Sequence, residues 1–501
     1  MKYIIGIDIG TTHTKAVVTS TKGEVLYEEK AHYPTLQPSP GYIEQDPVQI
    51  FEAVIEVLGK VLISVPNNKD VMAVCFSAAM HSIMAIDKQG VPLTNLYTWA
   101  DTRANKYARE LKDSEKGKLI YSQTGTAVHP MSPLCKIAWI KYELPEIFLN
   151  TYKFISVKEY IFYRLFNCYV VDYSVASATG LFNNHTFKWN EDSLQFAGIT
   201  TDYLSEPVST THSELLKNEV FVKRFNLEKE LPFIIGASDG CLAILGSGAI
   251  SPNEAALTIG TSGAVRKMND QPMNDNQGRL FAYVLDDKLF VCGGASNNGG
   301  IVLKWFAENM LGKTFSSAES FTWFMRTAAE APAGSNGLIF LPYIYGERSP
   351  VWNADARGVF LGINSSHTSS HFMRAILEGI SFSLCQILEA MEESGTEIDT
   401  IYASGGFIES DFWLQLLSDI LNKKVIVSHA ADASAMGAIF LALRALGFIK
   451  DWNEVKDLVV TSAVFHSNGA THKQYASNFE IFSSLYKKLE PDFAILSGIS
   501  K

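Results

Sequence analysis

Two segments of this 501-residue chain, one at its start and one near its middle, share the order strand, turn of small residues, strand. Apolar, β-branched runs predict the strands, and Gly, Thr and Ser interrupt them. The first repeat comprises Tyr3–Ile9, Gly10-Thr11-Thr12 and Lys15–Ser20, and the second comprises Glu254–Ile259, Gly260-Thr261-Ser262-Gly263 and Ala264–Lys267. A repeated order of elements indicates a duplicated α/β architecture. We expect two domains, over residues 1–249 and 250–501.

A hairpin and a helix extend the first repeat. Lys22-Gly23 is a tight-turn signal, and Glu24–Ala31 returns as a third strand. Asp46 is a predicted N-cap, with Pro47 at the first helical position. The residues that follow at helical spacing are Val48, Phe51, Val54, Ile55, Leu58 and Leu62. This spacing predicts a helix with one apolar face packed on the sheet.

Charge and hydropathy exclude some classes of partner. The formal net charge is −11, whereas a nucleic-acid-binding surface needs clustered Lys and Arg to neutralise phosphates. The apolar runs fall short of the roughly 18–20 residues that a membrane span needs. Asp8 interrupts the apolar N-terminal run where a signal peptide would have its core. We therefore expect a cytoplasmic protein with no nucleic-acid and no membrane partner.

The turn in each repeat has the composition of a phosphate-binding loop. Gly10 permits close backbone approach, Thr11 and Thr12 offer hydroxyl and amide donors, and Lys15 supplies a cation. Asp8, at the end of the preceding strand, is suited to hold hydrated Mg²⁺, which prefers few carboxylates together with phosphate oxygens. The alternative is a structural hairpin in which Thr favours strand geometry. A matching second turn at Gly260–Gly263 favours the phosphate interpretation.

Two buried strands end in polar residues. Pro232–Ser238 runs into Asp239, which could cap the following helix or act as the general base that phosphoryl transfer to an alcohol requires. Phe76–Ala79 runs into Met80 and His81, and a single His in such a place is more often a satisfied core residue than a ligand. Gly405-Gly406 lies between a predicted strand and a helix, where it could serve close packing or lie against a flat nucleotide base.

Two long motifs extend these observations. The first is the run Met131–Glu143, MSPLCKIAWIKYE, and the second is Gly358–Ile363, GVFLGI, followed after seven residues by His371–Glu378, HFMRAILE. Both resemble the signatures of the FGGY family of carbohydrate kinases, and the resemblance runs from about Tyr3 to Leu446. It implies an α/β fold of two actin-like, ribonuclease-H-like domains with a cleft between them. The first domain would carry the sugar pocket, the first phosphate loop and the catalytic Asp. The second would carry the other phosphate loop and the adenine side.

The resemblance also assigns roles by position. Asp239 is the implied catalytic base and also contacts the substrate. The implied nucleotide and phosphate residues are Gly10, Thr11, Thr12, His13, Lys15, Gly260, Thr261, Gly300, Gly405, Gly406 and Ser410. The implied substrate-binding residues are Met80, His81, Asp101, Arg103 and Asp239. ATP is the implied co-substrate.

The segments around the sugar site look most like those of the gluconate kinases in this family: Ala78–Ser82, Thr98–Arg103, Gly125–Pro133, Val171–Ser174 and Gly236–Gly240. Gluconate carries a carboxylate, so a cation or several donors should lie in its pocket. Four residues are candidates, and the sequence does not choose among them: Arg103, His81, His129 and Lys136. Each could equally be a surface or structural residue.

The sequence thus predicts an ATP-dependent sugar-acid kinase that converts D-gluconate to 6-phosphogluconate with Asp239 as general base. Its partners would be a small sugar acid or sugar and ATP or ADP, and a homodimer stays open as the assembly. A xylulose-type ketose kinase of the same family is the nearer alternative, because only the sugar pocket differs. A non-catalytic, nucleotide-dependent binding module is the more distant one, since the actin-like fold hosts those too.

Overall fold

The chain folds into two units that are not continuous in sequence. The computed structural model describes residues 1–227, 230–273, 275–395, 397–428 and 432–499. The first unit contains residues 1–250, 268–292 and 430–459, and the second contains residues 251–267, 293–429 and 460–501. The chain therefore passes between units within strands β16 (Gly263–Asn269) and β18 (Leu289–Ser296). A division of the domains at residue 249 remains a proposal.

A six-stranded mixed sheet forms the centre of the first unit, in the order β13-β14-β5-β1-β2-β3. Its strands are β1 (Tyr3–Ile9), β2 (His13–Ser20), β3 (Val25–His32), β5 (Val71–Ala78), β13 (Ser213–Leu215) and β14 (Pro232–Ser238). β1 pairs antiparallel with β2 and parallel with β5, and β14 also runs parallel to β5. The predicted strand-turn-strand order of the first repeat is present, with β2 beginning two residues earlier than its apolar run.

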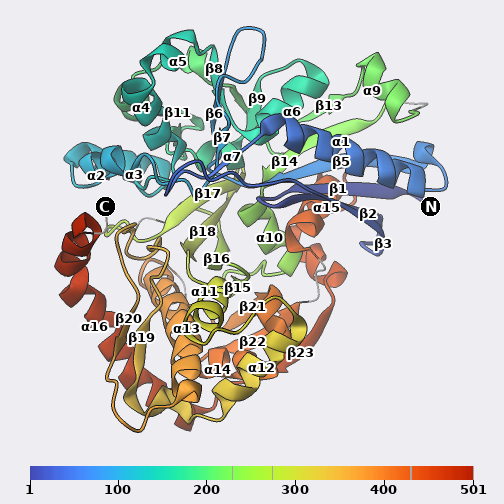
Figure 1. The fold of residues 1–501 in the computed structure, drawn as a ribbon. Coiled ribbons are helices and arrows are strands. Elements are labelled where there is room, and N and C mark those ends of the chain that lie inside the picture. Colours follow the sequence, from blue (N-terminus) through green and yellow to red (C-terminus); the bar gives the residue numbers. More distant parts are fainter. Residues whose placement is uncertain (228–229, 274, 396, 429–431, 500–501) are drawn as a thin grey trace. The chain divides into compact units, whose positions relative to one another are not determined.

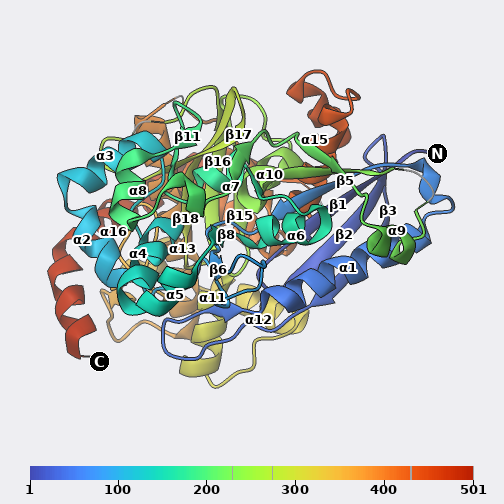
Figure 2. The same cartoon turned by 90° about the horizontal axis from the view of Figure 1, so that it is seen from above.

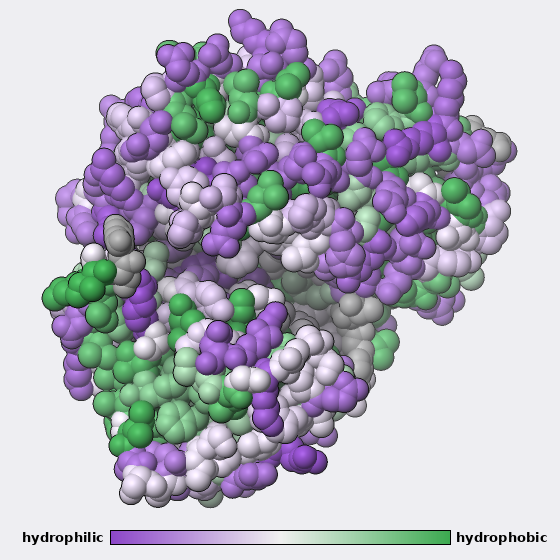
Figure 3. Space-filling model, in the orientation of Figure 1, coloured by the Kyte–Doolittle hydropathy of each residue, from purple (hydrophilic) through white to green (hydrophobic). Residues whose placement is uncertain are grey.

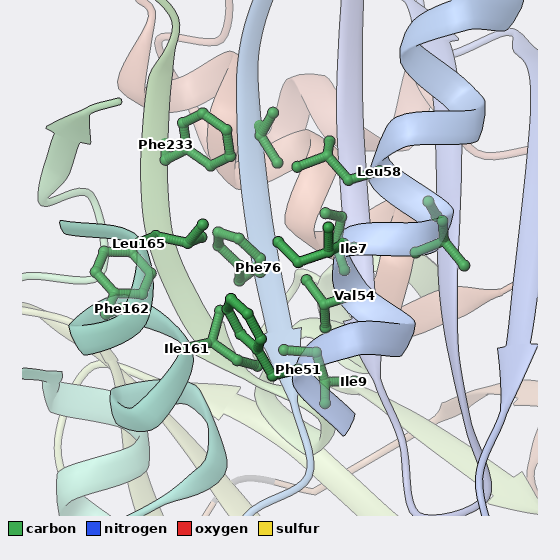
Figure 4. Packing of buried hydrophobic residues seen from close by; sticks show 14 of the residues in the cluster. Ile7, Ile9, Phe51, Val54, Leu58, Phe76, Ile161, Phe162, Leu165 and Phe233 are labelled. Carbon is green, nitrogen blue, oxygen red and sulfur yellow. The ribbon is translucent and has the colours of Figure 1, made fainter. Parts of the chain in front are cut away.

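Helices α1 (Pro47–Ser64) and α6 (Val157–Phe166) cover one face of this sheet (Figure 1). Asp46 caps α1 by accepting the N–H of Val48, as its sequence predicts. The side chains that meet here are Phe51, Val54 and Leu58 from α1, Ile161, Phe162 and Leu165 from α6, and Ile7, Ile9, Phe76 and Phe233 from the strands (Figure 4). Val48 is the exception to the predicted apolar face, because it is 43% exposed in the first turn.

Helices α10 (Asp239–Ser247) and α15 (Ala433–Ala445) also belong to the first unit, and α15 packs on β1 and β5. Glycines permit this close approach. A Cβ on Gly6 would lie 2.5 Å from the carbonyl oxygen of Ala435. Between the helices, a Cβ on Gly246 or Gly437 would lie 1.9 Å from a backbone oxygen of the other helix. Seen from above, α1 lies along β1 and β2 (Figure 2).

The rest of the first unit is built of short elements. Its helices are α2 (Asn105–Lys112), α3 (Glu115–Thr124), α4 (Pro133–Glu143), α5 (Pro145–Asn150), α7 (Tyr173–Ser177), α8 (Glu191–Ala197) and α9 (Glu219–Arg224). Its short strands are β4 (Glu44–Gln45), β6 (Met84–Ile86), β7 (Leu96–Tyr97), β8 (Lys153–Ile155), β9 (Val170–Asp172), β10 (Phe182–Asn183), β11 (Lys188–Trp189) and β12 (Glu206–Val208). β17 (Phe281–Asp286) packs on α7.

The second unit repeats the arrangement of strands. β15 (Glu254–Ile259) pairs antiparallel with β16 and parallel with β21 (Thr400–Ser404), and β22 (Lys424–Ser428) and β23 (Thr461–Phe465) follow in the sheet. Two short strands, β19 (Ile339–Leu341) and β20 (Val359–Leu361), form a separate pair. The helices are α11 (Gly300–Trp305), α12 (Ala318–Ala329), α13 (Ser369–Glu393), α14 (Asp411–Leu421) and α16 (Gly469–Ile499). The second predicted strand-turn-strand is therefore also present, from β15 to β16.

On the face drawn in Figure 3, hydrophilic residues dominate the surface over α1 and α9, with isolated hydrophobic side chains between them. Singly exposed apolar residues of this kind, such as Ile63 on α1 at 85% exposure, are ordinary for a folded chain. In the part of the chain that the structure describes, none of the helices has both the length and the apolar character that crossing a membrane requires.

The glycine contact between α10 and α15 yields a stability prediction. Alanine normally stabilises a helix interior by about 1 kcal/mol relative to glycine. At Gly437 the added methyl group would meet the backbone of α10, so we expect Gly437→Ala to lower the free energy of unfolding by about 2 kcal/mol net. Gly59, in α1, is the matched control, because its Cβ would lie 3.9 Å from the nearest atom, a Phe225 ring carbon. Gly59→Ala should leave stability equal or raised in denaturant titrations, and equal losses at both positions would contradict the prediction.

Candidate active site

The candidate site of the first unit lies where three neighbouring parallel strands end. Asp8 of β1 is in register with Ser77 of β5, and Ser77 is in register with Ala237 of β14. Because parallel strands end at the same edge of a sheet, the residues that follow them gather there, as ligand sites in open α/β sheets do. The predicted phosphate turn, Met80 with His81, and Asp239 are those residues. The sequence indicates three strand ends, and the order β14-β5-β1 brings them together.

Asp8 is partly buried, and its carboxyl group lies among other acids. Burial raises the pKa of Asp8 well above its usual range, and the negative charges of Asp432 and Asp239 raise it further. The Ser77 hydroxyl donates a 2.5 Å hydrogen bond to Asp8 Oδ1, and Lys15 acts in the opposite direction on the same pKa. Asp432 caps α15 by accepting the N–H of Ala435. Sequence reasoning missed Asp432, whose only local signal is that of a helix N-cap.

The first turn is held by side chains from outside it. The backbone oxygen of Gly10 accepts the Tyr33 hydroxyl at 2.6 Å, and the Thr11 hydroxyl accepts the indole N–H of Trp99 at 3.1 Å. The Thr12 hydroxyl lies 2.9 Å from His13 Nδ1. Burial lowers the pKa of His13, and nearby Lys30 lowers it further.

Lys15 is placed at the side of this turn by its strand. It stands opposite Asp8 in the antiparallel register of β1 and β2. Its Nζ lies 3.0 Å from the carboxylate of Glu28, which is exposed, while the Lys15 side chain itself is only 13% exposed. The turn therefore has a backbone that is fixed by hydrogen bonds, with the Lys15 ammonium group beside it.

Asp239 is the first residue of α10, half-buried, and does not cap the helix. Ser238 occupies the N-cap position, and Asp239 Oδ1 accepts the N–H of Gly240 at 2.7 Å. The backbone oxygen of Asp239 accepts the Ser434 hydroxyl at 3.2 Å. Negative charge at a helix N-terminus is stabilised by the helix dipole. The fold thus presents a carboxylate at the end of β14.

Met80 lines a narrow pocket together with Gly10, Thr11, Thr98 and Trp99. His81 adopts the left-handed conformation, with a φ of 65°, which is uncommon for a residue with a side chain and tends to occur at functional sites. Its Nδ1 lies 2.7 Å from the carbonyl oxygen of Ala178 and therefore carries a proton. His81 Nε2 lies 3.4 Å from the hydroxyl of Tyr283. His81 therefore has a buried imidazole that is held in one orientation after the end of β5.

Asp101 and Arg103 form a buried ion pair with a third member. The Arg103 guanidinium lies 2.7 Å from Asp101 and 2.6 Å from Glu44, and the Arg103 side chain is 3% exposed. It also stacks on the rings of Tyr97 and Tyr42, at 3.7 and 4.2 Å from the centroids. Sequence reasoning missed Glu44 and Tyr42, which lie far from the motif along the chain.

The remaining two carboxylate candidates differ in their surroundings. Lys136 is completely buried, and its Nζ donates to the carbonyl oxygens of His81 at 2.9 Å and Thr98 at 2.5 Å. Burial lowers the pKa of Lys136 to about 7, although Asp101 acts against this. His129 Nδ1 accepts the N–H of Met131 at 3.2 Å, so neutral His129 carries its proton on Nε2.

In the second unit, four of the predicted nucleotide residues line one cavity of about 420 Å³: Gly260, Thr261, Gly300 and Gly406. The Thr258 and Ser404 hydroxyls lie 3.0 Å apart across the paired strands β15 and β21, so the residues after these strands share one edge. The other lining residues are Ile259, Ile301, Leu303, Lys304, Phe315, Phe321, Phe407 and Trp413. No motif pointed to Phe315, Phe321 or Lys304.

Gly405 and Ser410 shape this cavity without lining it. Gly405 has a φ of 101°, and a Cβ there would lie 2.4 Å from the carbonyl oxygen of Ile259, so only glycine fits the turn. The Ser410 hydroxyl accepts the N–H of Trp413 at 3.2 Å and caps α14.

Among the described residues, no group of three or more His, Cys, Asp or Glu side chains is arranged to hold a metal ion. Asp8 fits Mg²⁺ in another way. A divalent cation would offset the repulsion that it shares with Asp239 and Asp432, and Mg²⁺ commonly takes one or two carboxylates and completes its shell with water and phosphate oxygens.

Comparison with known proteins gives matches along the whole chain. The model of the N-terminal domain of the FGGY family of carbohydrate kinases matches residues 3–246, and that of its C-terminal domain matches residues 255–446. A gluconokinase from Bacillus subtilis is 41% identical over 505 residues, covering 100% of this chain and 98% of the relative. Two solved structures from Lactobacillus acidophilus, a ligand-bound xylulose kinase and a gluconate kinase, each show 34% identity and a TM-score of 0.93. Each covers 99% of this chain, and the chain covers 100% and 99% of them, respectively.

The depressed pKa of Lys136 gives the protein a pH-dependent stability. Between pH 7 and about 10 the unfolded chain keeps the Lys136 proton while the folded chain loses it, so this lysine makes stability rise with pH. We expect wild type to gain up to about 1.4 kcal/mol per pH unit over Lys136→Met between pH 7 and 9. Denaturant titrations of both proteins at pH 7, 8 and 9 measure this difference.

Lys141→Met is the control for that experiment, because Lys141 lies on the same helix but is partly exposed. Its difference from wild type should stay constant over the same pH range. A pH-independent difference for Lys136→Met would contradict the depressed pKa.

Proposed function

Because the chain belongs to the FGGY family of carbohydrate kinases, we propose that it is an ATP-dependent sugar-acid kinase that converts D-gluconate to 6-phosphogluconate. The carbohydrate kinase activity follows from the family. The choice of gluconate is supported by the full-length likeness to a gluconokinase. We further propose that the enzyme works in the cytoplasm.

One observation carries the proposed chemistry: the ends of β1, β5 and β14 lie side by side. Each contributes a different group, since Asp8 and the Gly/Thr turn follow β1, Met80 and His81 follow β5, and Asp239 follows β14. Phosphoryl transfer to an alcohol needs positioning, charge stabilisation and a base, and little covalent chemistry. The first unit offers all three at one edge.

In the proposed mechanism, Asp239 accepts the proton of the 6-hydroxyl group as this oxygen attacks the γ-phosphorus of ATP in line. The P–O bond to ADP breaks and ADP leaves with the electron pair. The backbone N–H groups and hydroxyls of Gly10, Thr11 and Thr12 bind phosphate oxygens, with His13 and Lys15 beside them. Asp8 would hold Mg²⁺, which neutralises phosphate charge when it is bound.

The second unit would bind the rest of the nucleotide. Gly260 and Thr261 offer a second close backbone approach for phosphate, and Gly300, Gly405, Gly406 and Ser410 shape the cavity for the base. Phe315 and Phe321 line the same cavity and suit a flat, apolar ring system. Ser410 acts through the cap of α14 in this proposal, since its hydroxyl already accepts a backbone N–H.

The proposed substrate-binding residues are Met80, His81, Asp101, Arg103 and Asp239. Arg103 would act through its neighbours, because its guanidinium already pairs with two carboxylates, and Lys136 likewise donates to two carbonyl oxygens. His81 and His129 are the other two candidate partners of the gluconate carboxylate.

A xylulose-type kinase is the second candidate function, favoured by the equal similarity to the xylulose kinase structure. It would use the same Asp239 and the same two turns. A non-catalytic binding module is less favoured, because Asp239 and a Met-His segment lie at one edge, whereas a module without sugar chemistry needs neither.

Removal of the proposed base should abolish turnover and spare binding. We expect Asp239→Asn to lower kcat by about three orders of magnitude or more while the Kd for ATP changes less than about twofold, because Asn keeps the shape and loses the proton acceptor. An ADP-release assay measures kcat, and calorimetric titration with ATP measures the Kd. Asp192→Asn, in the first turn of α8, is the control with unchanged kcat. Near-normal turnover of Asp239→Asn would remove Asp239 from this role.

Substrate preference is tested by ADP release from the purified protein with gluconate, xylulose, ribulose, glycerol and rhamnulose. We expect kcat/KM for gluconate to exceed that for xylulose by about tenfold or more, because a carboxylate paired with buried donors gains charge-assisted hydrogen bonds that a ketose cannot form. A higher kcat/KM for xylulose would make xylulose the proposed substrate and would leave the proposed mechanism unchanged.

A further inference from the structure

The backbone directly before Asp239 lacks regular sheet pairing on one side. The chain at residues 210–215 accompanies β14 as far as Gly236, whose N–H donates to the carbonyl oxygen of Thr210 at 3.1 Å. The register with β5 is irregular between Ile234 and Ala237, and Gly236 has a φ of 72°. A Cβ on Gly236 would lie 1.7 Å from the carbonyl oxygen of Phe76. The pairing with residues 210–215 thus stops at Gly236, two residues before the strand ends at Ser238.

Beyond Gly236, side chains bind the backbone groups that residues 210–215 do not contact. Lys158, in the first turn of α6, donates from Nζ to the carbonyl oxygen of Ala237 at 2.9 Å. Ser174 Oγ accepts the N–H of Ser238 at 3.1 Å and lies 2.9 Å from the Ser238 hydroxyl. Both residues before Asp239 are therefore bound by side chains.

These two side chains are themselves fixed. Lys158 Nζ lies 2.7 Å from the carboxylate of Asp172, with side-chain exposures of 2% and 0%. Asp172 Oδ1 also accepts the N–H of Val175 at 2.9 Å and so caps α7, the helix that carries Ser174. A buried charge needs a partner to be tolerated, so the ion pair keeps Lys158 in place.

We infer that Lys158, Asp172 and Ser174, the Asp239 brace, set the position of the catalytic carboxylate. The inference rests on the proposed role of Asp239 as the base. None of the three residues of the brace needs to touch the substrate. A general base must lie within hydrogen-bond reach of the proton that it accepts, and a misplacement of about 1 Å can cost roughly a hundredfold in rate. The brace is therefore expected to act on kcat more than on substrate affinity.

Ser174→Ala is the sharpest variant, because it removes one hydroxyl and leaves the ion pair intact. We expect kcat to fall by about tenfold to a hundredfold, with the KM values for sugar and ATP within about twofold of wild type. Ser193→Ala is the matched control. Ser193 is equally buried in the same unit, and its hydroxyl donates to Asn190 at 2.9 Å. Its kcat should stay within about twofold of wild type.

A second pair of variants separates position from stability. Lys158→Met leaves Asp172 buried without its partner, so it should lose both stability and kcat. Lys158→Met combined with Asp172→Asn removes the charge and keeps an acceptor for Val175. We expect the double variant to regain stability in denaturant titrations, while its kcat stays as low as that of Lys158→Met. Recovery of kcat along with stability would overturn the brace.

Hydrogen exchange tests the inference without any turnover. Peptides that cover residues 236–240 should exchange faster in Ser174→Ala than in wild type, and at an unchanged rate in Ser193→Ala. Unchanged exchange in Ser174→Ala, or a kcat within twofold of wild type, would overturn the brace. A wild-type protein inactive on every sugar tested would instead overturn the proposed function, and the exchange data would still decide whether the brace holds this backbone.

Discussion

The parallel pairing of β14, β5 and β1 is the constraint on which the candidate site depends. Each strand delivers one kind of group to the same edge of the sheet: an acid with a Gly/Thr turn, a Met-His pair, and a carboxylate. The strands are far apart along the chain, so no local structure could bring these groups together. The close packing behind the sheet, through Gly6, Gly246 and Gly437, then fixes the helices that begin at or near the acids.

Buried charge is the second organising principle of the first unit. Arg103 and Lys158 are both nearly inaccessible to water, and each binds oxygen atoms from segments remote in sequence. Desolvating a charge is costly, so each cation persists only with its full set of acceptors. These polar contacts thereby join segments that are remote in sequence.

The sequence predicted much of the fold and less of the site. Strand ends, the Asp46 cap and the two small-residue turns follow from local patterns, and the two signatures indicate the family. Glu44 and Lys158 carry no such signal, and Asp432 carries only that of a helix N-cap, because their importance arises from neighbours that only the folded chain supplies. Val48 was predicted wrongly for a related reason. Helical spacing placed it on the apolar face, but it lies in the first turn of α1 and is exposed. Phe315 and Phe321 enter the second cavity from a segment without any motif.

The return of residues 430–459 to the first unit has a consequence for biosynthesis. Helix α15 covers the Gly6 side of the sheet and brings Asp432 toward Asp8, yet it begins only at residue 433 of 501 and is therefore made late in synthesis. Until then α15 does not cover β1 and β5. The acidic cluster of the first unit is also incomplete. Maturation of the first unit is thus tied to synthesis of the second, and a fragment ending near residue 250 would lack α15.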